Sequence, residues 1–188
     1  MTWRGYPEVP VRAKLGLAPW FALLVVAGGV AQDRGWVDLR AGPLPHHHRS
    51  PTIPPPPVSR LGRADIPPAY LALYRSAAAT CPGLSWAVLA GIGKEETNHG
   101  RSTLPGVRSG ANFAGAMGPM QFLAGTWAEY GRGGDVYDPR DAVPGAARLL
   151  CANGARDGRD VPGAVYAYNH AWWYVRAVLD FARAYERK

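Results

Sequence analysis

Beyond residue 66, apolar residues recur mostly at the spacing of α-helices. The stretch AYLALYRSAAAT follows Pro67 and Pro68, which suit a helix start. Its apolar side comprises Leu71, Tyr74, Ala77 and Ala78. A final helix shows the same spacing at Trp172, Val175, Val178, Leu179 and Ala182. Because no alternating strand pattern competes, the sequence predicts a mainly α domain.

Two further helices are indicated by residues that suit helix caps. Asp141 is expected to cap a helix through AVPGAARLLCAN, which ends at Gly154. Asp160 is expected to cap a short helix that leads to Tyr168 and Asn169.

The helical stretch from Ala87 to Gly100 carries an acidic residue on its apolar side. At about 100° per residue, one arc contains Trp86, Val88, Leu89, Ile92 and Gly93. Glu96 falls near the middle of this arc, Glu95 at its edge and Lys94 opposite. Burial raises the pKa of a carboxyl group, which suits proton donation near neutral pH. Glu96 is therefore a candidate general acid, with solvated surface as the alternative.

A second candidate segment, GAMGPMQFLAGTW, runs from Gly115 to Trp127. Small residues precede Pro119, Met120 and Gln121, so the backbone there can approach a ligand closely. The preceding residues 104–118 are rich in Gly, Ser and Asn, which indicates a loop.

Three segments, in this order, resemble the lytic transglycosylases of the soluble-lytic-transglycosylase type, which share a fold with goose-type lysozyme. They are GKEETNHGRS at 93–102, GAMGPMQF at 115–122 and AYNHAWWYV at 167–175. The resemblance covers about residues 67–185 and implies a lysozyme-like helical domain with a glycan-binding groove. Thr97 stands where the family commonly has Ser, and it keeps the hydroxyl group.

The resemblance also implies roles for single residues. Glu96 would be the catalytic acid/base, and Met120 and Gln121 would line the groove. Tyr168 and Asn169 would complete the substrate-binding residues, with Tyr168 near Glu96; for Asn169 a role in the local turn is the alternative. The resemblance implies neither a metal nor an organic cofactor.

The number of carboxylates bears on the mechanism. Most glycoside hydrolases use a pair, whereas Glu95 and Glu96 are the only acidic residues near a motif. A lone acid/base suits a substrate that supplies its own nucleophile. The resemblance accordingly implies peptidoglycan glycan strands, cleaved between N-acetylmuramic acid and N-acetylglucosamine with a 1,6-anhydro product.

Two alternatives stay open. Asp135, Asp138 and Asp141 lie in a turn-like segment and are interpreted as structural, but one of them across the groove from Glu96 would favour a lysozyme-type hydrolase. A non-catalytic wall-binding scaffold is the second alternative.

Residues 1–31 have the layout of a signal peptide or a membrane anchor. Arg4, Arg12 and Lys14 precede the apolar stretch LGLAPWFALLVVAGGVA, residues 15–31. This stretch is at the short edge of what spans a bilayer. A cleaved signal and an uncleaved anchor are therefore both open.

Residues 32–63 are interpreted as a linker, and residues 64–188 as the domain. The linker contains AGPLPHHHRSPTIPPPP, which favours an extended spacer. We therefore expect an exported protein at the cell wall or the extracellular face, either free or anchored to the membrane by residues 15–31.

The distribution of charge disfavours a nucleic-acid partner. The chain has 21 basic and 14 acidic residues, a formal net charge of +7. Residues 64–188 carry thirteen basic and eleven acidic residues, a net charge of only +2. A nucleic-acid-binding protein should carry a basic stripe in its folded part, so nucleic acid is not expected to bind.

Cysteine and aromatic residues add three expectations. Cys81 and Cys151 are the only cysteines, and in an exported chain such a pair predicts a disulfide; in a cytosolic chain they would be buried thiols. His99 is a candidate hydrogen-bond partner of Glu96, with capping or exposure as the alternative. Core packing and groove lining are both open for Trp127, Trp172 and Trp173.

Overall fold

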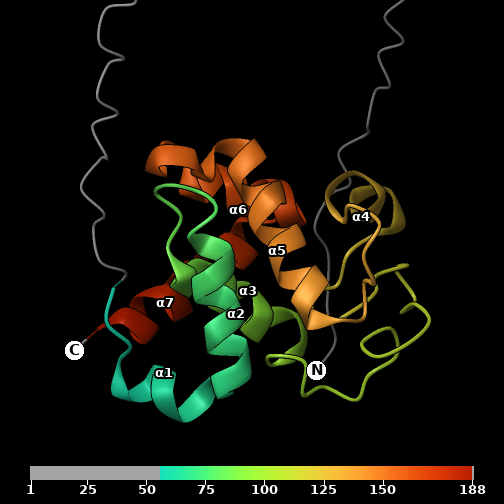
Figure 1. Cartoon of the computed structure of the whole chain (residues 1–188), viewed down its shortest axis with the longest axis horizontal. Coiled ribbons are helices and arrows are strands. Elements are labelled where there is room, and N and C mark those ends of the chain that lie inside the picture. Colours follow the sequence, from blue (N-terminus) through green and yellow to red (C-terminus); the bar gives the residue numbers. More distant parts are fainter. Residues whose placement is uncertain (1–55, 188) are drawn as a thin grey trace, which may run out of the picture. The chain divides into compact units, whose positions relative to one another are not determined.

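The computed structural model describes residues 56–187, and helices make up most of this part of the chain (Figure 1). They are α1 (Arg60–Asp65), α2 (Pro68–Ala78), α3 (Trp86–Thr97), α4 (Ala124–Tyr130), α5 (Pro139–Leu150), α6 (Val161–Asn169) and α7 (Trp172–Glu186). A π-helical turn at Cys151–Ala155 and a 3₁₀ turn at Arg156–Gly158 connect α5 to α6. The described residues contain no strand, only an isolated bridge between Met117 and Phe122. The predicted mainly α fold is confirmed.

Local sequence signals account for most helix starts. α2 begins at Pro68, a position where the missing N–H of proline costs nothing. At the start of α3, the Ser85 hydroxyl accepts a hydrogen bond from the backbone N–H of Ala87. The Asp160 carboxylate accepts one from the backbone N–H of Gly163 at 2.8 Å. The predicted cap of α6 is therefore confirmed.

The predicted cap of α5 at Asp141 is wrong. The cap is Asp138, whose carboxylate accepts a hydrogen bond from the backbone N–H of Arg140 at 2.8 Å. Pro139 has a fixed φ angle that suits the first helical position, so the helix begins there. Asp141 lies inside the first turn, where its carboxylate accepts a hydrogen bond from the backbone N–H of Asp135 at 2.9 Å.

α3 is the central helix of the domain. It packs against α2, α5 and α7, and Figure 1 shows it between α5 and α7. Every residue from Trp86 to Gly93 is buried, so the predicted apolar arc belongs to a helix that is buried on all sides. At Gly91, an added Cβ would lie 2.4 Å from the carbonyl oxygen of Val178 in α7. Glycine therefore permits the close approach of these two helices.

The disulfide predicted from the cysteine pair is present. It joins Cys81, which follows α2, to Cys151, which follows α5, across a sequence separation of 70 residues. Cross-linking such a long loop restricts the unfolded chain and stabilises the fold by ~4 kcal/mol in the chain-entropy view.

The domain begins earlier than the predicted boundary at residue 64. The Trp86 indole N–H donates a hydrogen bond to the carbonyl oxygen of Pro56 at 3.0 Å. The backbone N–H of Ser59 donates one to the carbonyl oxygen of Tyr185 at 2.7 Å, and the Ser59 side chain caps α1. The last residues of the predicted linker are therefore part of the domain.

The predicted signal or anchor at residues 1–31 lies outside the described residues, as does the linker up to residue 55. Across residues 56–187, no helix has the length and apolar character needed to cross a bilayer.

We expect reduction of the disulfide between Cys81 and Cys151 to lower the thermal stability of the full chain. Reduction restores the conformational freedom of a long loop to the unfolded state, at a cost of ~4 kcal/mol. Thermal unfolding with and without dithiothreitol, followed by circular dichroism, measures the effect. A Cys81→Ala/Cys151→Ala variant is the control, and its unfolding midpoint should be the same with and without dithiothreitol. An unchanged midpoint for the reduced parent would contradict the expectation.

Candidate active site

Glu96 lies on the last turn of α3, where the helix leaves the core. The helix ends because Asn98 and His99 adopt left-handed conformations, with φ angles of 52° and 57°. Glu96 is partly exposed, whereas the adjacent Thr97 is buried. The carboxyl group is thus placed at the boundary between the core and the surface.

Burial raises the pKa of the Glu96 carboxyl group from its ordinary value of 4.5 to about 7. A hydrogen bond from Tyr174 acts in the opposite direction, and the negative charge of Glu95 adds to the rise. A carboxyl group with a pKa near the working pH can both donate and accept a proton. The burial predicted from the helical arc therefore has the chemical effect expected of a general acid.

Tyr174, on the first turn of α7, is the direct partner of Glu96. Its hydroxyl donates a hydrogen bond to Glu96 Oε1 at 2.6 Å, and the residue is only 2% exposed. Sequence reasoning gave Tyr174 no role, although it stands in the third motif. Its spacing of four residues from the buried Val178 was the available signal that it faces the core.

Tyr168, predicted to lie near Glu96, is stacked on Tyr174 instead of hydrogen-bonding the carboxylate. The two rings are nearly parallel, at 8°, with centroids 6.5 Å apart. The Tyr168 hydroxyl donates a hydrogen bond to the carbonyl oxygen of Met120 at 2.8 Å. Tyr168 therefore supports both Tyr174 and the loop that carries Met120.

Thr97 attaches this loop to the end of α3. Its hydroxyl donates a hydrogen bond to the carbonyl oxygen of Pro119 at 2.6 Å and accepts one from the backbone N–H of Gly100 at 2.8 Å. Serine, the commoner residue in the resembling family, would carry the same hydroxyl. The contact holds the loop next to Glu96.

Met120 and Gln121 are placed differently within the loop. Met120 is 0% exposed, so neither its side chain nor its backbone is open to solvent, and its carbonyl oxygen is bonded to Tyr168. The Gln121 amide donates a hydrogen bond to the carbonyl oxygen of Gly118 at 2.8 Å and accepts one from the Asn112 amide at 3.0 Å. The substrate-binding roles of both residues stay predictions, and Asn112 is a loop residue that sequence reasoning missed.

The remaining candidate groove residues divide between surface and core. Asn169 is exposed at the end of α6, and its substrate-binding role stays a prediction. Trp172 and Trp173 are 58% and 60% exposed, whereas Trp127 is half-buried with its ring 5.1 Å from that of Phe122. Trp127 therefore packs with the core, and the glycan groove itself stays a prediction.

His99 does not form the candidate hydrogen bond with Glu96, and the alternative of an exposed side chain is not met either. His99 is 1% exposed, and its two ring nitrogens lie 3.0 Å from the Tyr74 hydroxyl and 3.3 Å from the Tyr185 hydroxyl. Because Asn98 and His99 reverse the chain direction, the imidazole turns back into the core. Burial lowers the pKa of His99 to about 4, so the ring is neutral near pH 7.

Asp65, from α1, anchors the same end of α3. Its carboxylate accepts hydrogen bonds from the side chains of Lys94 at 2.9 Å, Tyr185 at 2.6 Å and Arg101 at 3.0 Å. Burial alone would raise the pKa of Asp65, but these donors outweigh it and hold the pKa well below its ordinary value. Asp65 is therefore a structural anion, unlike Glu96.

The interpretation of Asp135, Asp138 and Asp141 as structural residues agrees with their contacts. The Asp135 carboxylate accepts a hydrogen bond from the backbone N–H of Tyr137 at 2.9 Å, while Asp138 and Asp141 bond to their own turn as described above. Among residues 56–187, no three His, Cys, Asp or Glu side chains are grouped so as to hold a metal ion.

We expect Glu96→Gln to stabilise the protein at high pH. The pKa of Glu96 is higher in the folded state than its ordinary value, so its stabilising contribution is present below about pH 4.5 and is lost as the pH rises through about 7. Glutamine does not ionise, so the variant should exceed the parent by at most ~3 kcal/mol in the free energy of unfolding near pH ~8, and by little near pH ~4. Urea unfolding at both pH values measures this. An equal difference in the free energy of unfolding between variant and parent at both pH values would contradict the expectation.

Tyr174→Phe should raise the pKa of Glu96 further, because the hydrogen bond that it removes lowers that pKa. Tyr168→Phe is the matched control, since its hydroxyl bonds to Met120 instead. The pH dependence of the free energy of unfolding reports the shift, and its midpoint should move to higher pH only in Tyr174→Phe. Equal midpoints in the two variants would show that the bond has no such effect.

Comparisons with known proteins show the fold of the chain. No protein-family model matches the sequence, and no curated protein matches it either. The structure of the Escherichia coli lytic transglycosylase Slt35 in complex with bulgecin A is similar, with 17% identity and a TM-score of 0.50 over 66% of this chain and 76% of that chain. A structure of the same enzyme with calcium has 17% identity and a TM-score of 0.48 over 66% and 77%. The chain therefore has a lytic transglycosylase-like helical fold.

Proposed function

We propose that this protein is a peptidoglycan lytic transglycosylase with Glu96 as its acid/base. The observation that carries the proposal is the Glu96 carboxyl group, with a pKa of about 7 and a hydrogen bond from Tyr174. The lytic transglycosylase-like fold supports the same substrate class, peptidoglycan glycan strands.

In the proposed reaction, protonated Glu96 donates its proton to the glycosidic oxygen between N-acetylmuramic acid and N-acetylglucosamine. The C–O bond to the departing sugar breaks while the N-acetyl group of the muramic acid assists. The ionised Glu96 then accepts the proton of the 6-hydroxyl as that oxygen bonds to the anomeric carbon. The product is a 1,6-anhydro sugar, and no water is consumed. The Tyr174 hydroxyl holds the carboxylate in place through both steps.

A single carboxylate is sufficient for this reaction because the substrate supplies the nucleophile. A lysozyme-type hydrolase would use a second one in most families. The three aspartates of the 135–141 segment are engaged within their own turn. This observation favours the transglycosylase over the hydrolase.

We also propose that the protein is located outside the cytoplasm, at the cell wall. The disulfide between Cys81 and Cys151 supports it, because disulfides persist mainly in oxidising compartments. Attachment to the membrane through residues 15–31, if that segment is not cleaved, belongs to the same proposal.

The test is mass analysis of the fragments that the full chain releases from purified peptidoglycan. The parent should release products that lack one water, and Glu96→Gln should reduce the rate by at least about 100-fold, the typical contribution of a general acid. Glu95→Gln is the matched control: it should keep turnover, with a pH profile shifted to lower pH because one negative charge beside Glu96 is gone.

Other outcomes would contradict the proposal in distinct ways. Products with ordinary reducing ends would identify a hydrolase. Tight binding without release by the parent would identify a scaffold. Loss of activity in Glu95→Gln but not in Glu96→Gln would assign the acid to the neighbouring residue.

A further inference from the structure

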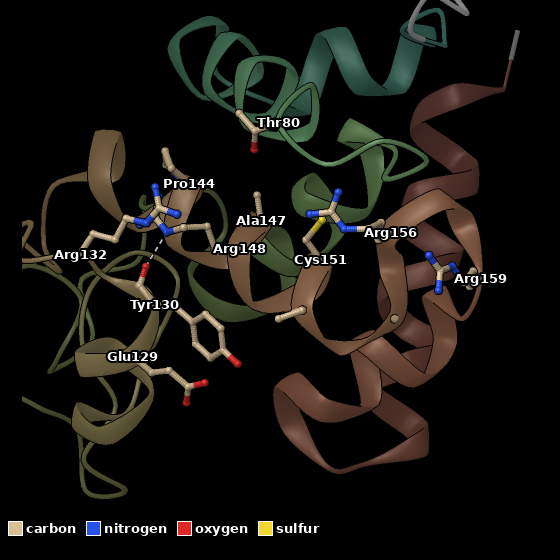
Figure 2. A pocket seen from close by; sticks show the side chains of 12 residues that line it. Thr80, Glu129, Tyr130, Arg132, Pro144, Ala147, Arg148, Cys151, Arg156 and Arg159 are labelled. Atoms are coloured by element: carbon tan, nitrogen blue, oxygen red, sulfur yellow. Dashed lines mark hydrogen bonds between the residues drawn. The ribbon is translucent and has the colours of Figure 1, made fainter. Parts of the chain in front are cut away.

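A cavity of about 790 Å³ lies between α4, α5 and the turns that follow α5 (Figure 2). We call it the arginine pocket, after four of its lining residues. These are Arg132, Arg148, Arg156 and Arg159. Glu96 is not part of its lining, so the pocket is separate from the candidate active site. Its volume is within the range of small-molecule sites.

The positive charge of the arginine pocket is largely uncompensated. Arg159 pairs with Asp157 at 3.1 Å. Across residues 56–187, the guanidinium groups of Arg132, Arg148 and Arg156 have no carboxylate within ion-pair distance. Glu129 is the one acidic residue in the lining. The pocket therefore has an excess of positive charge that suits an anion.

Arg148 is fixed in the pocket wall. Its Nε–H donates a hydrogen bond to the carbonyl oxygen of Tyr130 at 2.6 Å, drawn as a dashed line in Figure 2. Burial lowers the pKa of Arg148 and the positive charge of Arg132 lowers it further, whereas the negative charge of Asp141 acts in the opposite direction. An anion bound to both guanidinium groups would relieve this repulsion.

The arginines approach the pocket from two sides. Figure 2 shows Arg132 and Arg148 on one side and Arg156 and Arg159 on the other, with Ala147 between them. A carboxylate presents two oxygens along one edge, whereas a phosphate group presents oxygens in several directions and suits donors from opposite walls.

We propose that the arginine pocket binds a phosphate ester, in which the phosphate group is carried by a polyol or a sugar. The phosphate accepts hydrogen bonds from Arg148, Arg132 and Arg156. The uncharged part of the ligand packs against Tyr130 and Pro144, which also line the cavity and are partly exposed. This binding requires neither Glu96 nor glycan cleavage.

Titration calorimetry with the full chain tests the proposal. The probes are inorganic phosphate, glycerol 3-phosphate and a short poly(glycerol phosphate), with succinate as a carboxylate of similar charge. At least one phosphate ester should bind more tightly than succinate. Tighter binding of glycerol 3-phosphate indicates a free small-molecule ligand, and tighter binding of the oligomer indicates an anionic polymer.

Arg132→Gln/Arg156→Gln should weaken phosphate-ester binding by at least about tenfold, the effect of losing a hydrogen bond to a charged group. These side chains are exposed and Arg148 stays in place, so folding should persist. The control is Arg60→Gln/Arg176→Gln, which removes the same charge from exposed positions outside the pocket. Glu96→Gln should bind as the parent does.

Three results would overturn the proposal. They are no binding of any phosphate ester, binding no tighter than that of succinate, and equal losses in the pocket variant and its control. Equal losses would mean that binding depends only on the net charge of the protein and not on the pocket.

Discussion

Gly91 lets α3 approach α7 so closely that an added Cβ would meet the carbonyl oxygen of Val178 at 2.4 Å. From this contact, α3 continues for about one turn to Glu96, and α7 extends back for about one turn to Tyr174. The hydrogen bond between Tyr174 and Glu96 therefore depends on how the two helices cross. A bulkier residue at the crossing would separate the helices and move the tyrosine away from the carboxylate.

Two carboxyl groups near the C-terminal end of α3 have pKa values that are shifted in opposite directions. Asp65 is surrounded by donors, among them Lys94 and Arg101, and its pKa is held low. Glu96 has one hydroxyl donor and a negative neighbour, so burial dominates and its pKa rises to about 7. Because the cations near the end of α3 bond to Asp65, they do not neutralise Glu96. One carboxylate thus anchors the helix while the other is available for proton transfer.

Local signals in the sequence predicted a large part of this arrangement. Helical spacing placed Glu96 on an apolar arc, the Asp160 side chain marked the start of α6, and the two cysteines predicted a disulfide. Each of these depends on residues close in the chain or on there being only one possible pair. The start of α5 was misplaced because Asp138 and Asp141 are both acceptable caps, and only the position of Pro139 separates them.

Contacts between distant residues could not be predicted in the same way. The partners Tyr174 and Glu96 are 78 positions apart. The spacing of Tyr174 from Val178 indicates that it faces the core, but no local pattern says that its partner there is Glu96. His99 lies close to Glu96 in the chain, yet the left-handed residues that end α3 direct it toward Tyr74 and Tyr185. The arginine pocket likewise combines residues from α4, α5 and later turns that form no motif in the sequence.

Burial keeps the Glu96 carboxyl group partly protonated at neutral pH. The most direct measurement is a carbon-13 NMR titration of glutamate side-chain carboxyl groups in the full chain, with Glu96 assigned by comparison with Glu96→Gln. We expect a titration midpoint of about 7 for Glu96. A midpoint near the ordinary value of 4.5 would show that the carboxyl group is solvated and would contradict its role as a general acid.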